Sequence, residues 1–177
     1  MCNIRLARPD DEFVRAIGQI TSKKNRQTDD DRLEVDRLSF CGGLYMGDAG
    51  PIMPTANLRK CFIQAARVRR LGKSVERGLI PLGMSVPLDY PGPRTAEELW
   101  DDPQFRYSTV VTVGRAKVPR MRPHFPKWNL NAEWELLTDT LDLDDLVAIV
   151  QAAGLIEGLG DNRVNGFGRF EVEVTRA

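Results

Sequence analysis

The sequence has little of what metal and disulfide chemistry requires. Its three cysteines, Cys2, Cys41 and Cys61, are far apart, and His124 is its single histidine. Zinc sites place cysteine and histidine ligands at short, recognisable spacings, which this chain lacks. We therefore expect no metal site, and we expect the odd number of thiols to be free in a reducing compartment.

Long apolar runs and a net charge are also missing. No stretch has the length of a transmembrane helix, and Arg5 and Arg8 interrupt the first stretch, so neither a membrane span nor a signal peptide is expected. The 25 basic side chains balance the 25 acidic ones. A neutral chain has no global field that attracts nucleic acid, so any such binding must come from local patches.

The composition is otherwise that of a globular domain. With 177 residues, of which 42% are hydrophobic and 28% charged, we expect a single domain, 1–177, with a core of ordinary size. Insertions are expected near 22–53 and 89–104. The second is acidic and rich in proline, and a long excursion of this kind inside a compact domain suggests a role in function or interaction.

Apolar periodicity predicts an α+β fold. A list of expected elements follows: a short strand over 2–7, helices over 10–20 and 28–38, a hairpin over 40–53, a helix from Thr55 that ends at Gly72, strand pieces over 75–88, strands over 107–118 and 130–136, a helix over 142–153, and a last strand over 170–174. Thr28 and Asp31 have the spacing of a capping box. Without the insertions, this order fits a ferredoxin-like (RRM-like) βαββαβ core, a mostly antiparallel sheet with helices on one face.

The clearest charge asymmetry lies between Asp102 and Glu133, where six Lys or Arg residues occur without an acid. Prolines keep this ribbon extended, and its aromatic rings suit stacking on bases beside sugar-phosphate contacts. An exposed loop whose aromatic residues anchor it to the core is an equal alternative. The candidate residues are Arg115, Lys117, Arg120, Arg122, Phe125, Lys127 and Trp128.

The segment 154–174 joins a helix to the last expected strand through a glycine-rich loop. Gly158, Gly160, Gly166 and Gly168 are interleaved with Arg163, Asn165 and Arg169. Glycine allows another backbone to approach closely, so the loop packs tightly against a phosphate chain or is simply a tight connection with incidental charges. The loop has neither the strand–helix order of a dinucleotide-binding turn nor the ending of a P-loop, and we expect no cofactor.

Two segments resemble the RAMP superfamily, the repeat-associated proteins of CRISPR effector complexes. Residues 51–61 are similar to its helix entry, although Pro-Thr-Ala-Asn replaces Pro-Gly-Ser-Ser, and residues 158–170 are similar to its C-terminal glycine-rich loop. Most of the chain also resembles RAMP-like proteins of bacteriophages and mobile elements. The resemblance implies an RRM-like fold, single-stranded DNA or RNA as partner, a head-to-tail homo-oligomer, and the cytoplasm of a bacterial host. By position, it implies nucleic-acid contacts from Asn57, Arg59, Lys60, Arg163, Asn165 and Arg169.

Our main hypothesis is therefore a non-catalytic protein that binds single-stranded nucleic acid and assembles along it. The main alternative is a phage assembly or inhibitory subunit that keeps the fold without the ligand and docks its acidic excursion on a neighbour. A third hypothesis is a RAMP-type riboendonuclease that uses His124 with Tyr107 or Lys127. The acidic clusters at 29–31, 101–102 and 144–145 lie at helix starts or in loops, where acids complement the helix dipole rather than bind metal.

Overall fold

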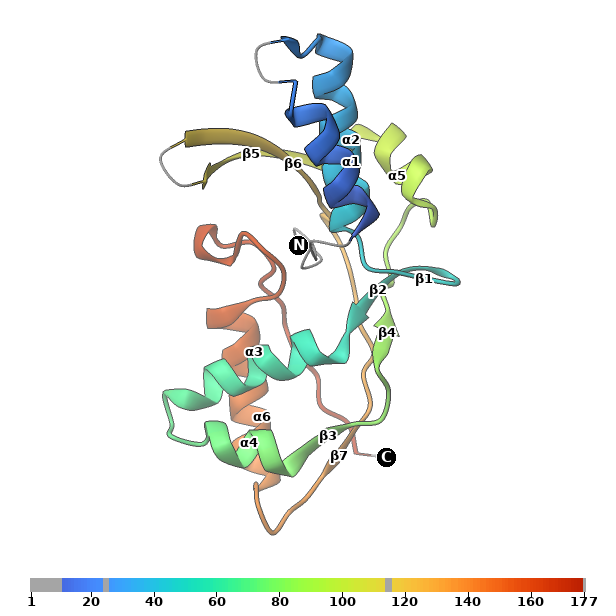
Figure 1. Ribbon diagram of the computed structural model, residues 1–177. Helices are drawn as coiled ribbons and strands as arrows, with labels where there is room; N and C mark the ends of the chain where they lie inside the picture. The colour runs from blue at the N-terminus through green and yellow to red at the C-terminus, as the bar shows by residue number, and fades with distance from the viewer. Residues whose placement is uncertain (1–10, 24–25, 114–115, 177) are drawn as a thin grey trace. The chain divides into compact units, whose positions relative to one another are not determined.

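The structure is a computed structural model that describes residues 11–23, 26–113 and 116–176, and the side chains of these apart from 111–118 (Figure 1). The chain is α+β, with helices and small antiparallel sheets. It divides into two compact units. Of the described residues, unit 1 contains those within 52–89 and 128–176, and unit 2 contains those within 11–51 and 90–127. Nearly all of both expected insertions falls in unit 2, so these segments have a core of their own.

Unit 1 contains the helix predicted from Thr55. This helix, α3 (Thr55–Arg67), buries Leu58, Phe62 and other apolar residues at helical spacing. The predicted end at Gly72 is wrong, because Arg70 takes the left-handed conformation with φ 61° and closes the helix. The amide of Leu71 donates to the Ala66 carbonyl at 3.0 Å, as in a Schellman motif. Gly72 instead begins the next helix, α4 (Gly72–Gly78), and the predicted helix over 142–153 is α6 (Leu143–Ala152).

The strands of unit 1 are short. β2 (Gly50–Pro54) pairs antiparallel with β4 (Ser85–Pro87), and β3 (Leu79–Pro81) pairs antiparallel with β7 (Trp134–Leu136). An isolated bridge joins Asp89 to Asn129 beyond these ladders. These pairs make segments 79–89 and 129–136 the two sides of an interrupted hairpin. Residues 90–127 are inserted between the two sides. Within the described part of the chain, the ladders do not include the four-strand order of a ferredoxin-like sheet.

The last strand predicted over 170–174 is wrong, since the structure assigns no strand to these residues. The amide of Phe170 donates to the Gly154 carbonyl at 3.2 Å, so the start of the segment is held by the glycine-rich loop. The alternation of apolar and acidic residues favours a strand, but a strand also requires a neighbouring edge with which to pair.

Unit 2 begins with α1 (Glu12–Thr21) and α2 (Asp29–Gly43). The predicted capping box is confirmed: Thr28 accepts from the Asp31 amide at 3.2 Å, and Asp31 accepts from the Thr28 amide at 3.0 Å. Helix α2 continues beyond its predicted end near Leu38, because Phe40 and Cys41 pack into the core. The hairpin predicted over 40–53 is therefore shorter and consists of β1 (Met46–Gly47) and the start of β2. The expected strand over 2–7 lies outside the described residues.

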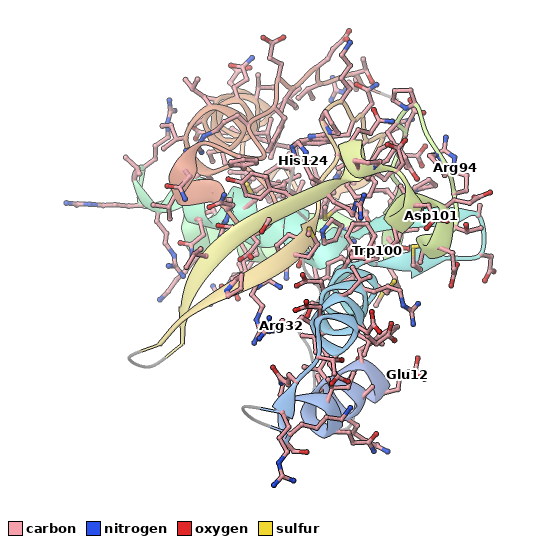
Figure 2. The ribbon with its side chains drawn as sticks, turned by 90° about the horizontal axis from the view of Figure 1, so that it is seen from above. Glu12, Arg32, Arg94, Trp100, Asp101 and His124 are labelled. Atoms are coloured by element: carbon pink, nitrogen blue, oxygen red, sulfur yellow. The ribbon has the colours of Figure 1, made fainter. Side chains whose placement is uncertain are left out.

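The acidic excursion supplies core to unit 2. It forms α5 (Ala96–Asp101) and the 3-10 turn η2 (Pro103–Phe105). Trp100 of α5, which is labelled in Figure 2, packs edge-on against Phe40 of α2. Their ring centroids are 5.5 Å apart. The ring of Tyr90 lies 5.7 Å from that of Phe105. These contacts fold the segment back on its own unit.

A two-stranded antiparallel ribbon completes unit 2. It pairs β5 (Arg106–Val113) with β6 (Ala116–Pro123), which confirms a strand in the region predicted over 107–118. The helices within the described ranges are all too short or too polar to cross a lipid bilayer.

Candidate nucleic-acid interface

The glycine-rich loop closes on its own backbone. It begins with the π-helical turn η3 (Ala153–Glu157), which follows α6, and contains the 3-10 turn η4 (Arg163–Asn165). The amide of Leu159 donates to the Gly168 carbonyl at 2.8 Å. A Cβ on Gly168 would lie 1.7 Å from the Leu159 oxygen, and one on Gly154 would lie 2.0 Å from the Phe170 oxygen. This approach of backbone to backbone accounts for these glycines without a ligand.

Two of the arginines predicted to contact nucleic acid bind helix-terminal carbonyls. The Arg169 guanidinium donates to the carbonyl of Ile156 in η3, and the Arg59 guanidinium donates to the carbonyl of Glu76 in the last turn of α4. The last carbonyls of a helix have no intrahelical partner, and cations near them also complement the helix dipole. Arg59 and Arg169 therefore have structural roles in unit 1 that the sequence did not indicate.

The other residues carried over from the resemblance vary in exposure. The Asn57 amide lies 3.7 Å from the Met53 sulfur, and the exposed Asn165 donates to Asn162 at 2.6 Å. Arg163 is half-buried, whereas Lys60 is exposed. Among the described residues no carboxylate lies within ion-pair distance of Lys60, so its ammonium is open to an external anion.

Cys61 seals the contact between α3 and the glycine-rich loop. Its Sγ lies 3.3 Å from the Gly158 carbonyl oxygen and 3.9 Å from that of Ala153. Burial raises the pKa of this thiol to about 12. A protonated, buried thiol is a poor nucleophile and a poor metal ligand.

Cys61 is therefore expected to resist alkylation in the native protein. Iodoacetamide at pH 8, read out by peptide mass spectrometry, should leave Cys61 unmodified for hours and modify it within minutes in 6 M guanidinium. The Gly166→Ala variant, whose added Cβ meets nothing within 4 Å, is the matched control and should keep the protection. Rapid native labelling of Cys61 would contradict the closed loop.

The predicted role of Phe125 as a base-stacking residue is wrong. Its side chain is 0% exposed, and its ring lies 4.8 Å from that of Tyr90 and 5.9 Å from that of Phe105. A base has no access to a ring face inside this cluster. For Phe125, the alternative that the aromatic residue anchors the segment to the core is the one the structure supports. Trp128, in unit 1, is half-buried and packs edge-on against Phe170 at 5.9 Å.

The cations of the β5–β6 ribbon are only partly available. Arg120 pairs with Thr109 and Arg122 with Tyr107, so both arginines occupy the same face of the ribbon, and both are half-buried. Burial raises the pKa of Asp36 on α2, and the positive charge of Arg120 opposes this rise. The remaining predicted cations of this segment are the exposed Lys127, Lys117, whose backbone lies opposite Thr112, and Arg115, which lies outside the described residues.

His124 lies beside Tyr107, with ring centroids 5.9 Å apart. Its amide donates to the Phe105 carbonyl at 2.7 Å, and burial lowers the pKa of its imidazole. Burial therefore favours the neutral form of the ring. The pairing with Tyr107 was one of the arrangements expected for a riboendonuclease, and the catalytic hypothesis itself stays a prediction.

A more open cationic surface lies on α3, α4 and the turn between them. Residues 55–78 contain a single acid, Glu76. The exposed cations of this segment are Lys60, Arg67, Arg69, Arg70, Lys73 and Arg77, and we call them the α3–α4 cationic surface. Of these, Arg69 lies 3.8 Å from a carboxylate oxygen of Asp145. The sequence signal was the local charge excess, which on sequence alone is more often a solvated helix face, so only Lys60 was predicted as a site residue.

Compared with protein-family models, with curated proteins and with solved structures, the chain gives no match in any of the three. The resemblance to the RAMP superfamily therefore rests on the sequence alone. Within the described ranges, no three His, Cys, Asp or Glu side chains converge on a position suited to a metal ion.

Proposed function

We propose that the protein is a non-catalytic binder of single-stranded nucleic acid whose main contact is the α3–α4 cationic surface. The observation that carries this proposal is the exposure of six cations on two packed helices and the turn between them, with one acid in the segment. A phosphate backbone is the polyanion that such a surface attracts, and binding releases its condensed counterions.

The α3–α4 cationic surface is a better candidate than the β5–β6 ribbon because its charges are more exposed. An exposed cation is fully available to a phosphate, whereas Arg120 and Arg122 are half-buried. We treat the ribbon as a second, weaker surface of unit 2.

The two RAMP-like segments support the finer part of the proposal. On that basis we propose a RAMP-like protein of phage or mobile-element origin, related to the ferredoxin-like folds, that acts in the cytoplasm of a bacterial host and assembles along a single strand. The preference for single strands comes from the resemblance and not from the geometry of α3 and α4, so the test below includes duplex DNA.

A second candidate function is a protein-interaction subunit that does not bind nucleic acid. The glycine-rich loop favours it, because Leu155, Ile156 and Val164 are exposed there, Val164 to 98%. Apolar side chains that gather on a surface segment are typical of protein contacts. This candidate predicts that the wild type binds no oligonucleotide and that reversing the cations of α3 and α4 does not change this.

The test is fluorescence anisotropy of labelled 20-nucleotide single-stranded DNA, single-stranded RNA and duplex DNA in 50 mM salt. Lys73→Glu with Arg77→Glu is expected to weaken binding by about tenfold to a hundredfold, and to reduce the salt slope by about 1.4 if each cation meets one phosphate of a single strand. The matched control is Arg120→Glu with Arg122→Glu, which reverses the same number of charges in unit 2 and should cost less than about fivefold.

Circular dichroism melting verifies that both variants remain folded. If the wild type has no affinity for any oligonucleotide in 50 mM salt, the proposal fails and the protein-interaction candidate stands. A larger loss in the ribbon variant than in the α4 variant would place the interface on unit 2 instead.

A further inference from the structure

Unit 1 also carries a strongly acidic segment. Residues 128–162 contain no lysine, arginine or histidine. The acids of this segment are Glu133, Glu135, Asp139, Asp142, Asp144, Asp145, Glu157 and Asp161, and apart from the half-buried Asp145 and Glu157 they are exposed. Both signs of charge are therefore concentrated on separate segments of one compact unit in a chain that is neutral as a whole.

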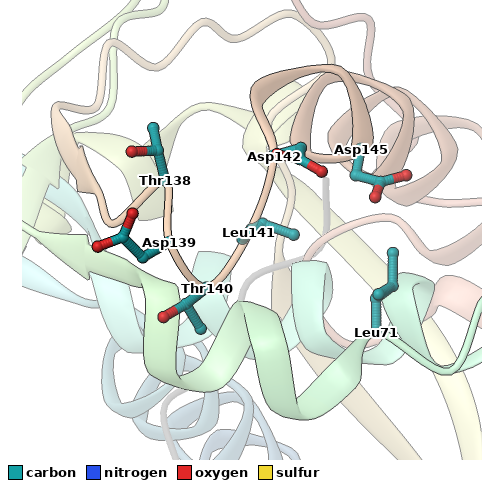
Figure 3. A pocket seen from close by; sticks show the side chains of 7 residues that line it. All are labelled: Leu71, Thr138, Asp139, Thr140, Leu141, Asp142 and Asp145. Carbon is teal, nitrogen blue, oxygen red and sulfur yellow. The ribbon is translucent and has the colours of Figure 1, made fainter.

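The opposite charges of the two segments approach one another at the α3–α4 turn, a place that we call the junction. Arg69, in the α3–α4 turn, lies 3.8 Å from Asp145 near the start of α6. Beside this pair is a shallow open depression lined by Leu71 of the turn and by Thr138, Asp139, Thr140, Leu141, Asp142 and Asp145 (Figure 3). Three carboxylates thus border a hollow next to a turn that carries Arg69 and Arg70.

The same junction has an apolar component. Val68 in the turn is 84% exposed, and Leu143 at the start of α6 is 37% exposed. Protein interfaces commonly combine an apolar centre with a charged rim. Val68 is flanked by Arg67 and Arg69, and Leu143 by Asp142 and Asp144, so each apolar residue is bordered by charges of a single sign.

We propose that two copies of this chain dock through the junction in a two-fold arrangement. The α3–α4 turn of one copy places Arg70 or Lys73 in the acidic depression of the other, and the reverse contact forms at the same time. In a two-fold dimer the same surface of each copy faces that of the other in reversed orientation. The cationic patch of each copy therefore meets the acidic patch of the other. A second copy is the partner that the charges indicate, because the cations and carboxylates that it needs are both on this chain.

This interface competes with any polyanion for Arg70 and Lys73. It does not depend on the proposed function, because it requires only the two segments of unit 1. If nucleic acid does bind the α3–α4 cationic surface, the dimer is the stored form, and binding of a strand releases monomers. Self-association and nucleic-acid binding are then mutually exclusive at this surface.

The test is analytical ultracentrifugation of the full chain at 1–100 μM in 50 mM and 500 mM salt. The wild type is expected to dimerise at low salt and to dissociate at high salt, because exposed charge pairs are screened. Two variants reverse the two sides of the contact one at a time. Arg70→Glu with Lys73→Glu reverses the cations, and Asp139→Lys with Asp142→Lys reverses the acids. The Asp142 side chain makes no capping hydrogen bond to α6, so its replacement leaves the helix start bonded as before.

Each variant alone is expected to lose dimerisation by about thirtyfold or more, and their equimolar mixture to regain it to within about threefold of the wild type. Restored association in the mixture also demonstrates that both variants are folded. A monomeric wild type at 100 μM in 50 mM salt, variants that still dimerise, or a mixture that stays monomeric would each overturn the proposal.

Anisotropy on the Asp139→Lys, Asp142→Lys variant separates this proposal from the proposed function, since that variant keeps every cation of α3 and α4. If it binds no oligonucleotide while the wild type dimerises as described, the proposed function fails and the dimer stands. If it binds oligonucleotide and the wild type is monomeric, the dimer fails alone.

Discussion

Replacing Gly168 with alanine is expected to lower the free energy of unfolding by about 4 kcal/mol or more, enough to unfold a domain of ordinary stability. The added Cβ would lie 1.7 Å from the Leu159 carbonyl oxygen, and the residue has φ +71°, a conformation that alanine rarely adopts. The added Cβ would meet the backbone of Leu159, whose amide donates to the Gly168 carbonyl. No side-chain rotation relieves such a clash. Urea denaturation followed by circular dichroism measures the loss.

Gly166→Ala is the matched control for that experiment. Gly166 also has a left-handed backbone, with φ +83°, but a Cβ there meets nothing within 4 Å. Only the conformational cost remains, about 1–2 kcal/mol. Equal losses for the two variants would show that the close approach of Gly168 to Leu159 is not a feature of the folded protein.

Truncating Phe125 to alanine is expected to cost about 3–5 kcal/mol of stability, the usual cost for a fully buried phenylalanine. Its ring fills the centre of a cluster with Tyr90 and Phe105 in unit 2, so its removal leaves a cavity that rigid aromatic neighbours do not fill. Thermal melting followed by circular dichroism measures the loss.

The conservative variant Phe125→Leu distinguishes a core residue from a stacking residue. It should fold at a cost of about 1–2 kcal/mol and should bind oligonucleotides as the wild type does. A residue that stacks on a base would instead lose about 1–3 kcal/mol of binding energy when its ring is removed. Unchanged stability with weakened binding would restore the stacking role and contradict the burial of Phe125.

Local signals in the sequence were sufficient where a short-range rule governs the structure. The capping box of Thr28 and Asp31 and the start of α3 near Thr55 depend on neighbouring residues only, and both were predicted. The end of α3 was not, because a left-handed Arg70 is an uncommon choice where glycine is the rule. The strand over 170–174 failed for a different reason, since pairing depends on a distant edge.

The candidate site was harder to predict because the sequence shows that a side chain is charged but not which groups it binds in the folded protein. Arg59 and Arg169 carry the right charge for phosphate, but helix-terminal carbonyls bind them, and those carbonyls are distant in sequence. Phe125 lies among prolines and cations, a setting that suits an exposed loop, yet Tyr90 and Phe105 enclose it from an excursion whose apolar residues follow no regular period. The cations of α3 and α4 were visible as a charge excess, and only the folded chain shows that they remain exposed.

The bridge between Asp89 and Asn129 has a consequence for the order in which the chain folds. Both sides of the interrupted hairpin must meet across the whole of residues 90–127, and the entropy lost in closing that loop rises with its length. The Tyr90, Phe105 and Phe125 cluster draws the two ends of this loop together from within. If those three rings collapse early, the loop that remains to be closed between residues 89 and 129 is shorter. The folding rate of unit 1 would then depend on a nucleus that forms in unit 2.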